Sequence, residues 1–447
     1  MVSKKDTTKW SELKYHVGFG NHFESEAEPG SLIKARNAPQ KCPMDLYAEQ
    51  LSGTPFTYSK AKNQRTWLYR IMPTCQHNQW FPCADFPQWI SNFDGNDESL
   101  VVTPAQRRWS PQDILDCDFM ASVRTMMGAG GPAMKSGLSI HYFGFRKNMS
   151  DKNVAMYSSD GDMLLVPQGG VLHITTEFGR MRACEKEIAV IPRGIKFSVD
   201  TEGEGCRGWI AEVYEGHFKI PDLGPIGSNG LANERDFETP MAAYSDVEGE
   251  QWTIYNRFQG KMFHHTQDHS PYDVVAWHGN YYPFRYDLNK FNTIGTISYD
   301  HPDPCIFTVL TVQTNDPGCA ALDFVIFPPR WLVGENTFRP PYYHRNTMSE
   351  FMGNIAGTYD AKEKGFIPGA SSLHSCMSGH GPEAEVFEKA SNAELSPQFV
   401  GAGSLAFMFE TCYMMKLTAH GNTKYVDADY QSCWKSLPRL FKKTAQQ

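Results

Sequence analysis

The sequence lacks the features that mark several large classes of protein. Its 447 residues contain no basic run, and the net charge is −8 with a pI of about 6.0. Nucleic acid and acidic membrane surfaces are therefore not expected partners. No apolar stretch approaches the roughly 18 residues that a membrane-spanning helix needs. The lysine-bearing start has no apolar segment behind it that would form a secretory signal.

Paired cysteines and the common nucleotide motifs are also missing. The eleven cysteines are scattered singly and form no CxxC pair, which argues against a disulfide framework or a zinc ribbon. We therefore expect mostly reduced thiols and a cytoplasmic location. No glycine-rich dinucleotide fingerprint, Walker lysine loop or GxSxG elbow occurs, so nicotinamide, nucleotide and serine-hydrolase functions have no support.

What the sequence does contain is a succession of short β-strand patterns. Hydrophobic residues make up 41% of the chain and aromatic residues 13%, which is ample for a packed core. Between about 155 and 218, apolar segments alternate with Gly and Pro at intervals of about ten residues, a spacing typical of a sandwich or barrel. The predicted strands are Asp162–Pro167, Gly170–Thr176, Glu187–Pro192, Ile195–Val199 and Gly208–Tyr214.

The fold prediction is a mainly β protein of two units, with cupin-like jelly-roll or β-sandwich architecture. Residues 1–283 would form a large N-terminal β domain containing a metal-free cupin-like unit at about 155–218, in which His173 is a packed strand side chain. Residues 284–447 would form a C-terminal iron-binding domain. Its clearest predicted strands are Phe291–Tyr299, Cys305–Val312, Leu322–Pro328 and Leu405–Met415. Pro111–Ser122 is a weak helix candidate.

The C-terminal region also contains a candidate metal site. Two imidazoles and one carboxylate hold a non-haem Fe(II) by one face and leave the other open. His344 and Glu350 supply one of each, and either His374 or His380 could supply the third ligand. In a straight strand His344 and Glu350 would lie roughly 20 Å apart. The chain must therefore turn between them if both bind one ion.

Other polar residues have a structural and a functional interpretation. His301 follows an apolar strand, so it is a candidate general base or a turn histidine held by the surrounding prolines. Tyr359 is a candidate hydrogen-bond donor to a substrate, or a partly buried aromatic residue. The cluster His264, His265 and His269 is expected to be solvated surface.

Long motifs along nearly the whole chain resemble the homogentisate 1,2-dioxygenase family. They include Gly18–Asn21, LYAEQLSGTPFT from Leu46, TWLYR from Thr66, SDGDMLLVPQ from Ser159, PDLGPIGSNGLAN from Pro221, VVAWHGNY from Val274, FVIFPPRW from Phe324, PPYYHRNTMSEFMG from Pro340 and SLHSCMSGHGPE from Ser372. So many matches in one order make a chance resemblance implausible.

The resemblance implies specific roles. The family's iron ligands fall on His344, Glu350 and His380, its proposed proton acceptor on His301, and a substrate-contacting residue on Tyr359. His374 falls beside the site, and His380 and His374 would also border the substrate. Asn346 replaces the second histidine of the usual cupin pattern, as it does in the family.

The implied reaction converts homogentisate and dioxygen to 4-maleylacetoacetate with Fe(II) as cofactor, in phenylalanine and tyrosine catabolism. The implied assembly is a homohexamer built as a dimer of trimers. Two alternatives are a cupin that binds or stores a small ligand without catalysis, and an iron dioxygenase acting on a related ring such as gentisate. The density of motifs argues against the first, and the full-length match argues against the second.

Overall fold

The computed structural model describes residues 9–34, 38–95, 97–222, 231–294, 304–359 and 365–442. Within these ranges the chain is mainly β, with almost entirely antiparallel pairing. Its helices are short: α1 (Phe119–Ser122) and α2 (Ala384–Ser391), with 3₁₀ turns such as Trp10–Glu12, Pro43–Asp45, Pro132–Met134, Ser150–Lys152, Glu234–Asp236, Leu288–Lys290, Pro304–Phe307, His420–Asn422 and Tyr430–Trp434. No helix in the described part of the chain has the length and apolar character needed to cross a membrane.

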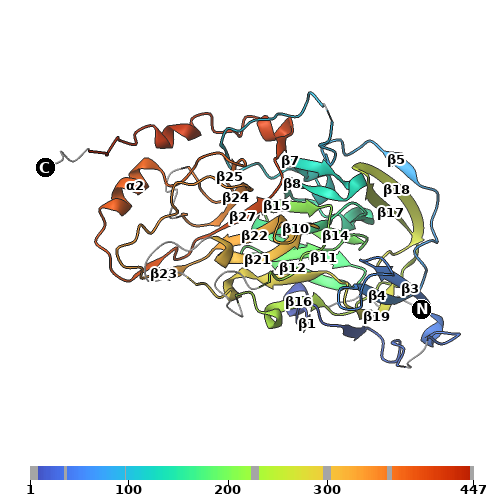
Figure 1. Ribbon diagram of the computed structural model, residues 1–447. Coiled ribbons are helices and arrows are strands. Elements are labelled where there is room, and N and C mark those ends of the chain that lie inside the picture. The colour runs from blue at the N-terminus through green and yellow to red at the C-terminus, as the bar shows by residue number, and fades with distance from the viewer. Residues whose placement is uncertain are drawn as a thin grey trace.

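A nine-stranded sheet forms the central layer of the molecule (Figure 1). In spatial order its strands are β1 (Tyr15–Val17), β16 (Phe237–Pro240), β20 (Phe284–Asp287), β13 (Glu187–Ile191), β10 (Asp162–Gly169), β15 (Cys206–Val213), β8 (Ser136–Phe145), β7 (Arg124–Gly131) and β28 (Lys416–Leu417).

A seven-stranded sheet covers one face of this layer and a six-stranded sheet the other. The first contains β12 (Gly179–Cys184), β11 (Val171–Thr176), β14 (Phe197–Asp200), β9 (Val154–Ser158), β17 (Glu248–Phe258), β18 (Lys261–His269) and β5 (Phe81–Cys83). The second contains β21 (Thr308–Gln313), β22 (Ala320–Phe327), β27 (Leu405–Thr411), β24 (Ser349–Ala356), β25 (Ser371–His374) and β6 (Arg107–Trp109).

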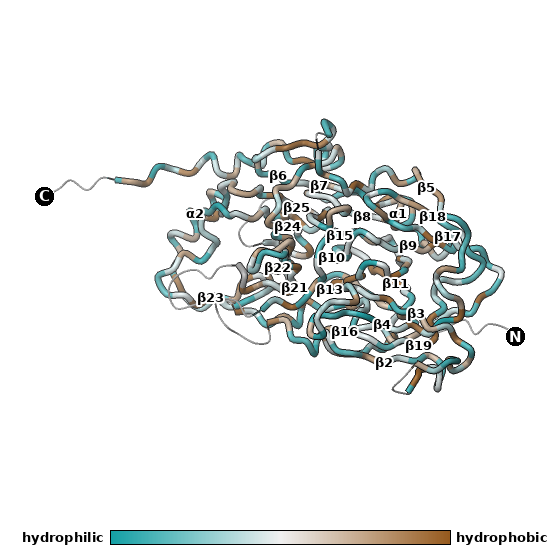
Figure 2. Tube along the Cα trace, turned by 45° about the vertical axis from the view of Figure 1, so that its right-hand side comes forward, coloured by the Kyte–Doolittle hydropathy of each residue, from teal (hydrophilic) through white to brown (hydrophobic). Residues whose placement is uncertain are grey.

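The sequence of β10 shows why the central sheet is covered on both faces. Leu164 and Val166 belong to the core shared with the six-stranded sheet, whereas Met163 and Leu165 belong to the core shared with the seven-stranded sheet. Alternate residues of a strand point to opposite faces, so a strand buried on both sides must be apolar throughout. Figure 2 shows the central sheet from a second direction, with β15 and β10 between β8 and β13.

Two smaller sheets complete the fold. One contains β2 (Phe23–Glu26), β19 (Val274–Gly279), β4 (Arg65–Arg70) and β3 (Tyr47–Ser52), and the other pairs β23 (Arg330–Leu332) with β26 (Gln398–Val400).

The two halves of the sequence exchange edge strands. The N-terminal strand β6 pairs with β25 in the six-stranded sheet, and the C-terminal strand β28 pairs with β7 in the central sheet. Aromatic contacts join the layers between them, since the Trp209 ring lies 5.1 Å from that of Phe407. The predicted division at 283/284 stays a prediction.

The mainly β sandwich expected from the sequence is confirmed, with differences in detail. The helix expected over Pro111–Ser122 is limited to α1, which begins after Asp118, whose carboxylate accepts a hydrogen bond from Ala121 N. The prediction missed β12. Residues 291–294 of the strand expected over Phe291–Tyr299 are not in a strand, and residues 295–299 lie outside the described part.

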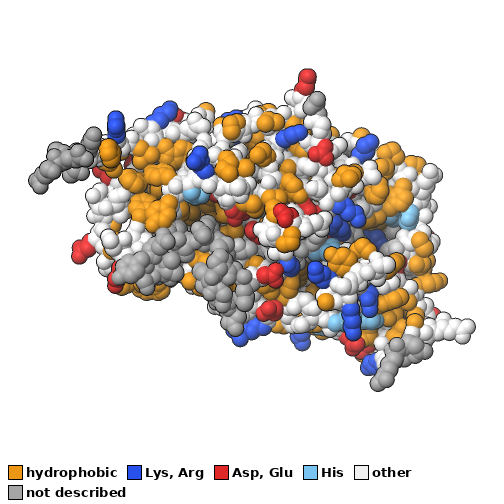
Figure 3. All heavy atoms as spheres, viewed as in Figure 1, with side chains coloured by type: hydrophobic (Ala, Val, Ile, Leu, Met, Phe, Trp, Pro, Cys, Tyr) orange, Lys and Arg blue, Asp and Glu red, His pale blue; other side chains and the backbone are white. Residues whose placement is uncertain are grey.

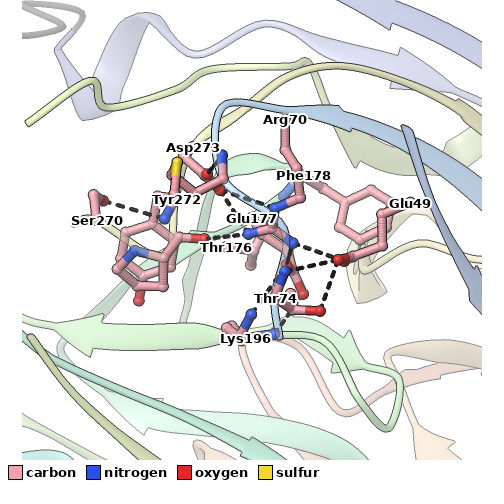
Figure 4. A network of polar contacts seen from close by, with 12 residues as sticks. Glu49, Arg70, Thr74, Thr176, Glu177, Phe178, Lys196, Ser270, Tyr272 and Asp273 are labelled. Carbon is pink, nitrogen blue, oxygen red and sulfur yellow. Dashed lines mark hydrogen bonds and ion pairs between the residues drawn. The ribbon is translucent and has the colours of Figure 1, made fainter. Parts of the chain in front are cut away.

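A buried charge network fastens the four-stranded sheet to the rest of the molecule (Figure 4). Arg70, which is 1% exposed, forms ion pairs with Asp273 at 2.6 Å, Glu49 at 2.9 Å and Glu177 at 3.1 Å. Although burial opposes ionisation of Glu49, Arg70 and hydrogen bonds from Thr74 hold the pKa of this carboxyl below its usual range. The guanidinium of Arg70 therefore pairs with two buried carboxylates and the half-buried Glu49, and Lys196 adds a second cation 4.0 Å from Glu177.

We expect Arg70→Met to lower the free energy of unfolding by about 3–5 kcal/mol, because it leaves buried carboxylates without a partner. Urea denaturation measures the loss. Arg65→Met, on the same strand but at an exposed position, is the control, with an expected change within about 0.5 kcal/mol. Equal effects of the two substitutions would contradict the role assigned to the network.

Candidate metal centre

The site begins with a pairing of two short backbone segments. His344 and His380 form an isolated antiparallel bridge, in which His344 N donates to His380 O at 2.9 Å and His380 N donates to His344 O at 3.1 Å. Glu350 lies next to this bridge as the second residue of β24. Figure 1 places β24 between β25 and β27.

The bend that the spacing requires occurs directly before β24. Asn346 Oδ1 accepts a hydrogen bond from Met348 N at 3.2 Å, a side-chain turn typical of Asn. The bend brings His344 back toward Glu350. As a result, ligand-type atoms of His344, Glu350 and His380 all lie within 4.8 Å of one another. Among the described residues, this is the one group of three such side chains that could hold a metal ion.

Each carboxylate oxygen of Glu350 faces a different imidazole. His380 Nε2 lies 3.0 Å from Oε2, and His344 Nε2 lies 3.6 Å from Oε1. The other nitrogen of each ring is held by the main chain: His344 Nδ1 donates to Tyr342 O at 2.7 Å and His380 Nδ1 donates to Ser378 O at 2.9 Å.

These bonds place one proton of each ring on Nδ1, so that Nε2, the nitrogen facing Glu350, is the atom that can bind a metal ion when it carries no proton. Two imidazole nitrogens and one carboxylate oxygen then converge from three directions. That donor set fits a divalent transition metal held on one face. The residues present therefore fit a metal cofactor.

The charge state of the cluster follows from the same contacts. Burial alone would raise the pKa of Glu350, but hydrogen bonds from His344 and His380 lower it to about 2. The hydrogen bond to Glu350 likewise raises the pKa of His344 above its ordinary value. Glu350 is thus the anionic member of the site.

His374 lies beside the cluster but is engaged elsewhere. Its ring stacks on that of His380 at 4.1 Å, and its Nε2 lies 2.9 Å from the hydroxyl of Tyr430. His374 Nδ1 is 4.0 Å from Glu350 Oε2. The geometry therefore groups His380, and not His374, with the other two side chains, a choice that spacing alone left open.

Tyr430 is itself packed against a cation from the N-terminal half. Arg108 of β6 lies over its ring at 4.5 Å from the centroid, and the same guanidinium bonds Asp427 at 2.7 Å. A residue from the N-terminal half thus supports the Tyr430–His374 contact at the metal centre.

A row of polar side chains crosses the sheet at the level of Glu350. Asp323 on β22 is opposite Glu410 on β27, Glu410 is opposite Glu350 on β24, and Glu350 is opposite His374 on β25. Burial and the neighbouring Glu350 raise the pKa of Glu410 to about 7. Burial also raises the pKa of Asp323.

Sequence reasoning missed the polar groups that lie around the cluster. Glu410 and Asp323 had a usable signal, because each is the one carboxylate within an otherwise apolar strand pattern, FMFET and ALDFV. The carbonyls of Tyr342 and Ser378 had none, since backbone acceptors carry no residue signature.

The other residues singled out in the sequence lie outside the cluster or outside the described residues. Tyr359 is buried beyond the end of β24, with its ring 5.4 Å from that of Phe327, and it is not one of the three side chains that could hold an ion. His301 lies outside the described residues. His173 is buried in β11 and stacks on Trp10 at 4.4 Å.

The expectation of a solvated cluster at His264, His265 and His269 was wrong for two of them. All three lie on β18, where His265 is 2% exposed and His269 is 9% exposed. The physical reason is the hairpin of β17 and β18, which turns His265 inward against the rings of Trp80 and His77, at 4.4 and 4.0 Å.

An opening adjoins the two histidines. It has a volume of about 740 Å³ and is lined by Tyr343, His344, Arg345, Gly379, His380, Trp434 and Leu437. The His344 side chain is 35% exposed, whereas Glu350 and His380 are each 7% exposed. The cluster is therefore reached from solvent on the His344 side.

Both parts of the chain match known families. Residues 14–288 match the family described as Homogentisate 1,2-dioxygenase N-terminal, and residues 289–441 match Homogentisate 1,2-dioxygenase C-terminal. Among solved structures, a single-residue mutant of Bacillus subtilis oxalate decarboxylase OxdC aligns with a TM-score of 0.31 and 13% identity, over 72% of this chain and 81% of that chain.

Full-length relatives are much more similar in sequence. Homogentisate 1,2-dioxygenase of Dictyostelium discoideum is 52% identical, with 95% of this chain and 97% of that protein covered. The enzymes of Drosophila melanogaster and Caenorhabditis elegans are 50% and 51% identical, each with 97% of this chain and 99% of the relative covered. Identity at this level across both segments shows that the chain belongs to the homogentisate 1,2-dioxygenase family.

Proposed function

We propose that this protein is an Fe(II)-dependent, ring-cleaving dioxygenase that converts homogentisate and dioxygen to 4-maleylacetoacetate. The convergence of His344, Glu350 and His380 in a chain of this family carries the proposal. His344, Glu350 and His380 would hold Fe(II), and the ion would supply the binding site for a chelating substrate and dioxygen.

The three proposed ligands have distinct tasks. His344 and His380 present Nε2, because their Nδ1 protons are bound to Tyr342 O and Ser378 O. Glu350 supplies one negative charge and faces both imidazoles. A site prepared in this way needs little rearrangement when the ion and substrate bind.

His301 is the proposed proton acceptor for the substrate hydroxyl, and Tyr359 the proposed hydrogen-bond donor to the substrate. The family resemblance supports both roles. Tyr359 follows β24, the strand that carries Glu350, and is buried between Phe327 and Phe366. His374 borders the site through its stacking on His380.

We further infer a cytoplasmic homohexamer, arranged as a dimer of trimers, whose chain divides at 283/284. Exposed apolar side chains support the assembly. Trp331, Val333, Phe399, Tyr342 and Tyr343 are each more than 40% exposed, and hydrophobic side chains gather at the end of the molecule that carries α2 and β23 (Figure 3). The family segments that meet at 288/289 support the division.

Oxygen uptake tests the reaction directly. The protein, loaded anaerobically with Fe(II), is expected to consume one dioxygen per homogentisate with appearance of maleylacetoacetate absorbance, and none with gentisate. Uptake with gentisate alone would favour the alternative ring dioxygenase. Absence of uptake with either substrate, at one iron per chain, would reject the proposed substrate.

Removal of the ligand charge tests the metal assignment. Removal of a group that only orients a ligand lowers metal affinity roughly 10- to 100-fold. Glu350→Gln changes a proposed ligand itself, so its loss of metal affinity is expected to be larger. Metal analysis after dialysis measures this. Asp323→Asn neutralises a carboxyl in the same row without touching the cluster and should retain metal. Full occupancy of the Glu350→Gln protein would exclude Glu350 as a ligand.

The proposed base can be separated from metal binding. His301→Ala should retain its iron and lose roughly 10²- to 10⁴-fold in turnover, the usual contribution of a general base. Iron content and the rate at saturating homogentisate are measured together, with the exposed His22→Ala as control. An unchanged rate would reject the assignment.

A further inference from the structure

Glu410 occupies a position that its strand does not explain. It follows Phe407, Met408 and Phe409 on β27, and the register places it directly opposite Glu350. Glu410 is half-buried, and a carboxyl partly withdrawn from water costs free energy unless it is hydrogen-bonded. Glu410 moreover lies beside a second carboxylate, which adds repulsion.

The contact that compensates Glu410 comes from Asn346. Asn346 Nδ2 donates to Glu410 Oε1 at 2.6 Å and is 3.5 Å from Glu350 Oε1. The side-chain amide of Asn346 thus lies between the two carboxyl groups and can donate one hydrogen bond to each. Glu410 is not a member of the group that could hold the ion.

Asn346 also connects the three segments that carry the proposed ligands. Its Oδ1 holds the bend before β24 through Met348 N, at 3.2 Å. Its backbone carbonyl accepts a hydrogen bond from Met377 N at 2.8 Å, in the segment that leads to His380. His344 is two residues away on the same loop.

We propose that Glu410 is a positioning residue of the metal centre, which acts through Asn346 to hold Glu350 and the His344 loop in binding geometry. The inference rests on the metal site of the proposed function. The anchor is rigid, because β27 pairs with β24 from Ser349 to Asn354 without a register shift. Loss of the anchor would let Asn346 rotate and the loop move relative to Glu350.

Metal affinity of the full chain tests this directly, with Fe(II) and Co(II) as probes in competition with a chelator. Glu410→Leu is expected to weaken the binding of both ions about 10- to 100-fold. This is the usual loss of affinity when a group that orients a ligand is removed. The visible spectrum of bound Co(II) should change as well, since it reports coordination geometry. Glu410→Gln keeps an acceptor for Asn346 and should restore wild-type affinity and spectrum.

Two further variants separate this link from general damage to the core. Asp323→Leu, in the same row but hydrogen-bonded to Thr311, should leave the dissociation constant unchanged. Asn346→Ala, at a half-buried position, should reproduce the loss even if Glu410→Leu does not fold. The double variant should bind no more weakly than Asn346→Ala alone, because Glu410 acts through Asn346.

Wild-type affinity and an unchanged Co(II) spectrum in Glu410→Leu and Asn346→Ala would overturn the inference, as would an equal loss in Asp323→Leu. A wild-type chain that binds neither ion would overturn the proposed function, and this inference with it. Binding by the wild type without an effect of the variants would leave the proposed function standing.

Discussion

The register of β24 is the constraint on which the site depends. Because side chains alternate along a strand, Phe351 enters the core shared with the central sheet, while Glu350 points to the opposite face. A slip of one residue would place the carboxylate among Trp109 and Phe409 and turn the aromatic ring toward the histidines. The packing energy of the aromatic face therefore fixes the position of the carboxylate on the other face.

Backbone pairing fixes the positions of the two imidazoles. His344 and His380 pair through their backbones, so their rings are brought together without relying on side-chain contacts. Each ring is then turned by the carbonyl two residues before it, Tyr342 for one and Ser378 for the other. Local chain geometry, rather than a distant network, sets the direction of the two nitrogens.

The sequence predicted the part of the structure that depends on local patterns. Apolar runs such as Asp162–Pro167 marked β10, and residue types marked His344 and Glu350, because Fe(II) chemistry needs those side chains. The choice between His374 and His380 depended on which backbone pairs with His344, which no local pattern specifies. Glu410 and Tyr430 likewise come from distant segments that only the sheet registers bring to the site.

The burial of histidines was harder to predict for a related reason. His265 lies in a polar stretch, yet the β17–β18 hairpin turns it against Trp80 and His77. Polarity of a segment predicts exposure on average, but a strand with one covered face buries every second residue whatever its type. Such side chains are accommodated as neutral rings, and burial lowers the pKa of His265 to about 4.

The exchange of β6 and β28 between the two halves has a consequence for how the molecule comes apart. Each half supplies an edge strand to the sheet of the other, so neither can unfold without uncovering the hydrogen-bonding edge of its neighbour. The layers are thereby joined into one cooperative unit. Release of metal on heating or in denaturant should therefore coincide with loss of the central sheet, and neither half is expected to survive alone as a soluble fragment.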